Sequence, residues 1–283
     1  MRTYRYPSDL TDAEWTILAP LVPGAKPGGR PRKHDTRELL DAIFYLVRGG
    51  GAWRMLPWHF PPWKTVYHYL RRWRLDGTWE HLSTVLRAAV RLSCARTPNP
   101  SAAVLDSRTV KTSSRGGPRG YDGGKKIKGR KHHILVDTMG LLLKAMVLPA
   151  DVSDRDGGAE LVLEAKEEQP RLRHLFVDGG YQGKWAEWVR GRLGWSVEVI
   201  SRRKLFSRGI WWPNGKPLPE WYFAAVEAEK GFHRLPRRWV VERTFAWLSF
   251  QRRLNRDYDL LPATTAACIL IASCRLMIRR LAS

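Results

Sequence analysis

Apolar side chains recur at helical spacing through the first 97 residues. In "ELLDAIFYLVRGGG" (38–51) they follow the 3.6-residue period until the run stops at three glycines. "KTVYHYLRRWRLDG" (64–77) and "TWEHLSTVLRAAVRL" (78–92) show the same pattern. Thr11 with Glu14, and Asp35 with Glu38, have the spacing of a helix-capping box. We therefore expect an all-helical N-terminal module over 1–97.

Beyond the proline-containing segment 96–103, the pattern changes to short apolar runs of strand length. These runs occupy 102–110, 132–137, 141–149, 174–180 and 196–201, and helical patterns at 157–167 and 184–194 lie between them. Strands alternating with helices indicate an α/β domain. The first three strands follow one another through turns, which favours antiparallel pairing. We predict a mixed five-stranded sheet flanked by helices over 98–283, ending in helices at 236–254 and about 262–281.

The net charge of the chain indicates which class of molecule it binds. It carries 49 Lys and Arg against 27 Asp and Glu, a net charge of +22. Such an excess favours binding to nucleic acid, because phosphate neutralisation supplies the sequence-independent part of the affinity. Three cysteines without metal-ligand spacing indicate reduced thiols. No apolar run reaches the roughly 20 residues that a membrane span needs, so we expect a cytoplasmic protein with no membrane partner.

Three acidic residues occupy positions typical of catalytic or metal-binding carboxylates. Asp106 and Asp178 each follow an apolar strand, and Glu242 is the only acid in "RRWVVERTFAWLSFQRRL" (237–254). At about 100° per residue, Arg238, Glu242, Ser249 and Arg253 fall on one polar stripe of a mostly apolar helix. A helix packed on the sheet would then aim Glu242 at the strand ends.

Convergent carboxylates beside a basic surface point to Mg²⁺, which takes hard oxygen ligands. The alternative for Glu242 is an ion pair with Arg238, four residues earlier. Asp106 and Asp178 could equally be turn or cap residues. Asp137 is explained by the turn "DTMG", and we favour a loop and helix cap for the acids of "ADVSDRDGG" (150–158).

Two basic segments are candidates for contacts with DNA phosphates. Residues 108–131 hold nine Lys and Arg, six glycines and one acid, and we expect a flexible loop beside Asp106. Its candidate contacts are Lys125, Lys126, Lys128, Arg130 and Lys131. The helical segment 64–74 could enter a major groove and offers Lys64, Arg71, Arg72 and Arg74.

Several stretches closely resemble the DDE transposases of bacterial insertion sequences, in the large group related to insertion sequence five. They are "AAVLDSRTVKTSSRGGPRGYDGGKKIKGRKHHILVDTMGLL", "LFVDGGYQG" and "LPRRWVVERTFAWLSFQRRL", and "LTDAEWTILAPLVP" resembles the N-terminal region of that group. The resemblance implies an RNase H-like core with Asp106, Asp178 and Glu242 as its catalytic and metal-binding triad. It also implies Mg²⁺, with Mn²⁺ able to substitute.

The implied activity is cleavage of DNA at the ends of an insertion sequence and joining of those ends to a target. The implied partners are the terminal inverted repeats and target DNA, bound by a homodimer associated with the nucleoid. A nuclease that cuts without joining, and a DNA-binding regulator with an inactive core, are the alternatives.

The sequence departs from the signature of the group in two places. That signature runs tyrosine, two residues, arginine, three residues, glutamate, six residues, lysine. Here Arg238 and Glu242 match, but Leu235 and Ser249 hold the tyrosine and lysine positions. Arg252 or Arg253 could supply the missing charge, so Arg238 and Arg253 join the DNA-binding candidates. The second departure is a long connection at 206–229, whose tryptophans could stack on bases or fill a local core.

Overall fold

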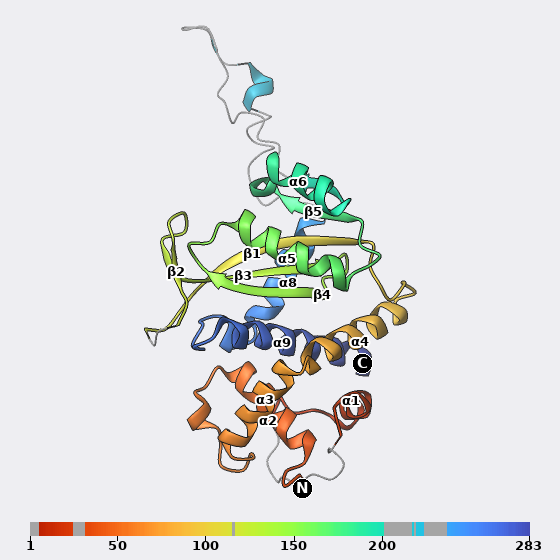
Figure 1. Cartoon of the computed structure of the whole chain (residues 1–283), viewed down its shortest axis with the longest axis vertical. Coiled ribbons are helices and arrows are strands. Elements are labelled where there is room, and N and C mark those ends of the chain that lie inside the picture. The colour runs from red at the N-terminus through yellow and green to blue at the C-terminus, as the bar shows by residue number, and fades with distance from the viewer. Residues whose placement is uncertain (1–5, 25–31, 115–116, 201–216, 218, 224–236) are drawn as a thin grey trace.

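The computed structural model describes residues 6–24, 32–114, 117–200, 217, 219–223 and 237–283 (Figure 1). The N-terminal region is helical, as its periodicity predicted. Its elements are α1 (Asp12–Leu18), η1 (Ala19–Leu21), α2 (Thr36–Gly49), η2 (Trp53–Met55), α3 (Trp63–Leu75) and α4 (Thr78–Ser93). The capping box predicted at Thr11 and Glu14 is present: each side chain accepts a hydrogen bond from the backbone N–H of the other residue.

A mixed sheet follows, and the predicted α/β class, a mixed sheet flanked by helices after a helical N-terminal module, is confirmed. Its strands are β1 (Ala102–Lys111), β2 (Gly120–Asp122), β3 (Ile127–Asp137), β4 (Leu142–Pro149), β5 (His174–Asp178) and β6 (Ser196–Ile200). β3 pairs antiparallel with β1, β2 and β4, whereas β1–β5 and β5–β6 are parallel. The five predicted strands are all present, and the short β2 is an addition that the pattern did not predict.

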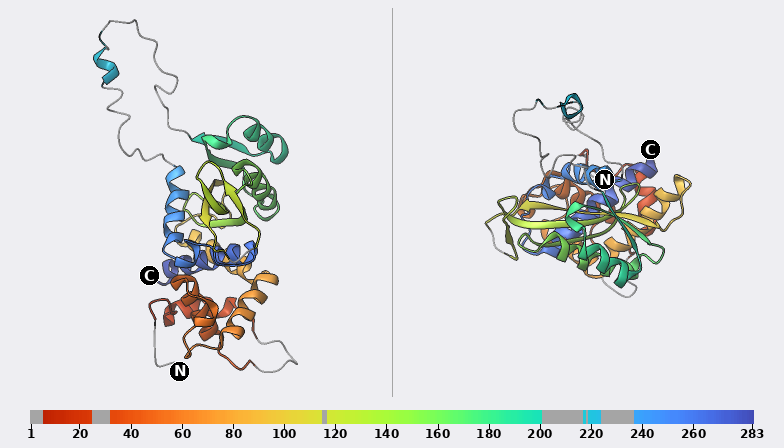
Figure 2. Two further views of the ribbon diagram at one scale, coloured as in Figure 1. Left: turned by 90° about the vertical axis from the view of Figure 1, so that its left-hand side faces the viewer. Right: turned by 90° about the horizontal axis from the view of Figure 1, so that it is seen from above.

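Helices cover both faces of the sheet (Figure 2). One face carries α5 (Asp154–Glu168) and α6 (Lys184–Leu193), and the other carries α8 (Arg238–Ser249) and α9 (Pro262–Ala282). The two-residue alternation of the strands divides the core accordingly. Ala103 and Leu105 of β1 belong to the cluster under α5 and α6, whereas Val104 belongs to a cluster shared with α8, α9 and the N-terminal helices.

Two predicted boundaries were wrong. The helix expected over 236–254 ends at Ser249, because Gln251 is extended (φ −90°, ψ 99°), and a short helix η4 (Arg252–Leu254) follows. Arg253 therefore does not continue the polar stripe of Glu242. The basic segment 108–131 is also more ordered than the expected loop, since β1, β2 and β3 take up much of it. Gly129 allows this pairing: a Cβ there would lie 1.9 Å from the Val110 carbonyl oxygen.

Within the described ranges, no helix has the length and apolar character needed to cross a membrane.

Candidate active site

The sheet register brings Asp106 and Asp178 to neighbouring positions. β1 and β5 are parallel, and Val104 lies opposite Phe176. Asp106 and Asp178 each come two residues later, so they extend from adjacent strands on the same face. Adjacent strands lie about 4.8 Å apart. Val104 and Phe176 both belong to the cluster that contains α8 residues, so this face is the one that α8 covers.

Helix α8 is fixed on that face by packing and by hydrogen bonds. Val241, Phe245 and Leu248 are buried. The Thr244 hydroxyl donates to the Gly140 carbonyl oxygen at 2.9 Å, in the turn between β3 and β4. Arg108, on the same face of β1 as Asp106, donates to the Phe245 and Leu254 carbonyls, and its guanidinium lies 5.3 Å from the centroid of the Phe245 ring. These contacts hold Glu242 beside the two strands.

Arg238 links Glu242 to Asp178. Its Nε lies 3.3 Å from Glu242 Oε1, and its Nη2 lies 3.8 Å from Asp178 Oδ2. The ion pair within the helix that the sequence suggested is therefore present, yet it leaves Glu242 linked to Asp178 through Arg238. Since one guanidinium contacts both carboxylates, the pair draws the helix acid toward the sheet acid.

The electrostatics of Asp106 show that the three acids interact. Burial is the largest cause that raises the pKa of Asp106, to about 7, and the charges of Asp178 and Glu242 raise it further. The Ser107 backbone N–H, 2.8 Å from Asp106 Oδ1, and the positive charge of Arg238 act in the opposite direction. At neutral pH this site is therefore short of positive charge.

A divalent cation would fit the chemistry of this donor set. Three carboxylates offer the hard oxygen ligands that Mg²⁺ prefers. Their mutual repulsion, visible in the pKa of Asp106, would be relieved by a bound cation. Within the described part of the chain, however, no group of three or more His, Cys, Asp or Glu side chains is arranged to hold a metal ion. Arg238 is the cation that contacts Asp178 and Glu242 in this state.

Sequence reasoning missed a second layer around Asp106. The Ser107 hydroxyl donates to Asp154 Oδ1 at 2.7 Å, and Lys131 Nζ lies 3.1 Å from the same carboxylate. Tyr181 is buried nearby; burial, then the charges of Asp106, Asp154 and Asp178, raise the pKa of its phenol. Ser153 does cap α5, as expected of this loop, but Asp154 in the first turn also reaches β1. The sequence signal that could have predicted this contact is the position of Ser107 directly after Asp106 on the strand.

The candidate DNA-binding residues of the basic segment fall into two groups. Lys125, Lys126 and Lys128 are exposed on the hairpin formed by β2 and β3. Lys131 is buried and bound to Asp154 and to the Val152 carbonyl. The exposed lysines are free to meet phosphate, whereas Lys131 helps to hold the layer behind Asp106.

Two further candidates are already engaged inside the protein. The Arg130 side chain is 0% exposed and pairs with Asp257 at 2.9 Å. Arg253 is 3% exposed; it pairs with Asp259 at 2.7 Å and donates to the Gly51 carbonyl oxygen. Both guanidinium groups are buried and paired with carboxylates, so neither is exposed at the outer surface in this state.

Helix α3 presents its basic residues unevenly. Val66, Leu70 and Trp73 face the core. Lys64 and Arg71, seven residues apart, are exposed on one face. Arg72 and Arg74 are partly buried, and Arg72 lies 4.0 Å from Asp76. Lys64 and Arg71 are thus the most exposed of the four candidate residues on this helix.

Of the two departures from the signature, Leu235 and most of 206–229 lie outside the described residues. Ser249 closes α8 and donates to the Ala246 carbonyl. Beyond it Arg252 is exposed, unlike Arg253.

Two family models match this chain. Residues 97–277 match the family described as "Transposase DDE domain", and residues 10–83 match "Putative transposase of IS4/5 family". The first match spans well over half of the chain. The chain therefore belongs to the DDE transposases of insertion sequences.

Curated relatives are similar over parts of their length. "Uncharacterized protein y4sN" of Sinorhizobium fredii is 32% identical over 77 residues, 27% of this chain and 62% of the relative. In Burkholderia cepacia, "Insertion element IS402 uncharacterized 16.2 kDa protein" is 30% identical over 115 residues, 38% of this chain and 76% of the relative. "Putative transposase for insertion sequence element IS402" is 33% identical over 131 residues, which cover 46% of this chain and 54% of the relative.

Among solved structures, the catalytic domain of Mos1 mariner transposase aligns with 89% of this chain and 94% of its own. At 11% identity and a TM-score of 0.26, this likeness adds no argument.

Proposed function

We propose that the protein cuts DNA at the ends of an insertion sequence and joins those ends to target DNA. The observation that carries the proposal is the placement of Asp106, Asp178 and Glu242. Two adjacent parallel strands and one helix aim these carboxylates at one face of the sheet. Membership of the DDE transposase family supports the same roles for the three acids.

Asp106, Asp178 and Glu242 would hold Mg²⁺, or Mn²⁺ in its place. Such ions neutralise charge on the oxygens that attack and leave in phosphoryl transfer. The residues of this chain supply the rest. Arg108 and Thr244 position α8, and Ser107 with Asp154 orients the strand next to Asp106. Because Arg238 contacts two of the three acids, it must release at least one of them when a cation binds among all three.

The DNA would lie across the exposed lysines of the hairpin and the exposed face of α3. Lys125, Lys126 and Lys128 offer charges on the hairpin, and Lys64 and Arg71 on the helix. These contacts position the duplex without reading its sequence. Joining two element ends to one target requires two active sites, so we propose a homodimer on DNA.

Asp178→Asn is the decisive variant. It keeps the size of the side chain and removes the charge, so it should abolish cleavage while DNA affinity changes little. The assay incubates labelled DNA carrying the element ends with Mg²⁺ and a target plasmid, and scores cut and joined products separately. Cutting without joining would identify a nuclease. Binding without either product in the wild type would identify a regulator, and loss of both binding and cleavage in Asp178→Asn would indicate a structural role.

A further inference from the structure

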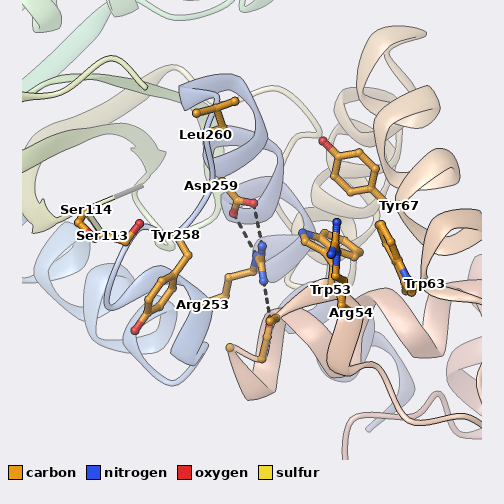
Figure 3. Close-up of a pocket in the computed structure, with 13 residues that line it drawn as sticks. Trp53, Arg54, Trp63, Tyr67, Ser113, Ser114, Arg253, Tyr258, Asp259 and Leu260 are labelled. Carbon is orange, nitrogen blue, oxygen red and sulfur yellow. Dashed lines mark hydrogen bonds and ion pairs between the residues drawn. The ribbon is translucent and has the colours of Figure 1, made fainter. Parts of the chain in front are cut away.

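A large aromatic cavity lies between the N-terminal helices and the catalytic region (Figure 3). Its volume is about 780 Å³, within the range of roughly 300–1,000 Å³ typical of small-molecule sites. Trp53, Trp63 and Tyr67 line one side, and Tyr258 and Ser113 line the other. The triad does not contribute to this lining, so the cavity is separate from the catalytic site.

Two arginines lie in the walls of the cavity, and one of them, Arg253, is paired with Asp259. The Arg253 guanidinium, held by Asp259 and by the Gly51 carbonyl, lies 5.0 Å from the centroid of the Trp53 ring. The Tyr67 ring meets Trp53 edge-on at a centroid distance of 5.0 Å. Arg54 lies 5.7 Å from the centroid of the Trp63 ring and is exposed. A planar aromatic group could stack on these rings, and a negative charge attached to it would be attracted by the exposed Arg54.

Trp53 also offers an unused hydrogen bond. Its indole Nε1 is buried, and no acceptor for its N–H is found among the residues that the structure describes. A buried donor without an acceptor costs about 1–3 kcal/mol. A ligand that brings an acceptor into the cavity would recover that cost.

The position of the cavity matches the proposed path of DNA. Trp63 and Lys64 begin α3, and Ser113 lies just beyond β1, in the segment that leads to the lysine-bearing hairpin. A strand that crosses from Lys64 to Lys125 would pass this opening. Seven residues separate Asp106 from Ser113, which at about 3.3 Å per residue is roughly 20 Å. With about 3.4 Å between successive base pairs, the cavity would lie several nucleotides from the cut.

We propose that this cavity receives an unpaired nucleobase of the bound DNA, stacked against Trp63 and accepting a hydrogen bond from Trp53 Nε1. The proposal rests on the DNA-binding function proposed above and adds a base-binding site to it. Aromatic side chains stack with any base, so the site would favour unpaired over paired DNA more than one sequence over another.

The test compares two strands with equal charge. One is an end-labelled 12-nucleotide oligothymidylate, and the other is a 12-unit abasic strand with the same phosphates. Fluorescence anisotropy measures the affinity of the full chain for each. The wild type should bind the base-containing strand at least about fivefold more tightly, as expected for stacking of one base.

Trp63→Ala should remove most of this preference and leave affinity for the abasic strand unchanged. Trp53→Phe keeps an aromatic ring but loses the donor, and should reduce the preference by about fivefold or less. Trp188→Ala is the matched control, because Trp188 is another solvent-accessible tryptophan but lies on α6, across the sheet. Unfolding midpoints equal to wild type confirm that each variant is folded.

Equal affinity of the wild type for both strands would overturn the base site and leave the proposed function standing. The same holds if Trp63→Ala keeps the preference, or if Trp188→Ala loses it as well. Failure to bind either strand or duplex DNA at low salt would instead overturn the proposed function, and the base site with it.

Discussion

Replacing Arg130 by methionine distinguishes a structural role from a role in DNA binding. The sequence suggests Arg130 as a DNA contact, whereas the structure buries it in an ion pair with Asp257. The guanidinium is completely buried and donates to Asp257 Oδ2 at 2.9 Å, and to the carbonyls of Pro118, Asp259 and Leu260. In Arg130→Met, the donors left to Asp257 among the described residues are the Thr265 hydroxyl and the Asp259 N–H.

Removing one partner of a buried ion pair costs about 3–5 kcal/mol, because the other charge stays buried without compensation. Folded domains are stable by only about 5–15 kcal/mol. Arg130→Met should therefore lose roughly a fifth or more of the free energy of unfolding. Urea titration followed by tryptophan fluorescence measures this loss.

The pH dependence of the loss is a second signature. Burial raises the pKa of Asp257, and Arg130 is the largest influence that lowers it. Without Arg130 the folded-state pKa rises further above its ordinary value. A carboxyl with a raised folded pKa stabilises the fold at low pH, and this stabilisation is lost as pH rises through that pKa. The deficit of Arg130→Met should therefore shrink as the pH falls from 7 toward about 4.

Lys128→Met is the matched control, since Lys128 lies two residues earlier on β3 and is exposed. It should change stability by less than about 0.5 kcal/mol and weaken DNA binding. The reasoning is refuted if Arg130→Met keeps its stability within about 1 kcal/mol and weakens DNA binding instead, because the guanidinium would then belong to the DNA surface.

Two further predictions concern the site and the hairpin. Because the pKa of Asp106 is about 7 in the metal-free protein, Mn²⁺ affinity should rise between pH 6 and 8 and level off above, with proton release near pH 6. Titration calorimetry in buffers of different ionisation enthalpy measures both, and an affinity that is flat across this range would contradict the raised pKa. Replacing Lys126 and Lys128 together by alanine should reduce the slope of log K against log salt by about two, one for each phosphate contact. An unchanged slope would remove the hairpin from the proposed DNA path.

Much of the fold was predictable because local patterns decide it. The 3.6-residue period located the N-terminal helices, and the short apolar runs located five strands. The end of α8 was not predictable in this way. The segment "SFQRRL" continues the pattern of polar and apolar residues of the helix. The helix nevertheless ends before Arg253, because the backbone of Gln251 is extended.

The acids of the site were predictable for a topological reason. Asp178 ends β5 as predicted, and the parallel register of β1 and β5 brings Asp106 beside it. The prediction that Asp106 follows its strand was wrong, because pairing with β3 continues β1 to Lys111. The fates of Arg130, Lys131 and Arg253 were not predictable. Their partners are set by tertiary contacts: Asp257 lies 127 residues from Arg130, and Gly51 lies 202 residues from Arg253. Composition alone counts all three as surface charge.

The central claim is that Asp106, Asp178 and Glu242 form one cation site for DNA cleavage. Anomalous diffraction of Mn²⁺ in crystals of the protein with DNA tests it most directly. The account predicts an anomalous peak about 2.1 Å from carboxylate oxygens of Asp106 and Asp178, with Arg238 released from at least one acid. A peak elsewhere in a cleavage-competent complex, with Arg238 still bound to Asp178 and Glu242, would contradict it.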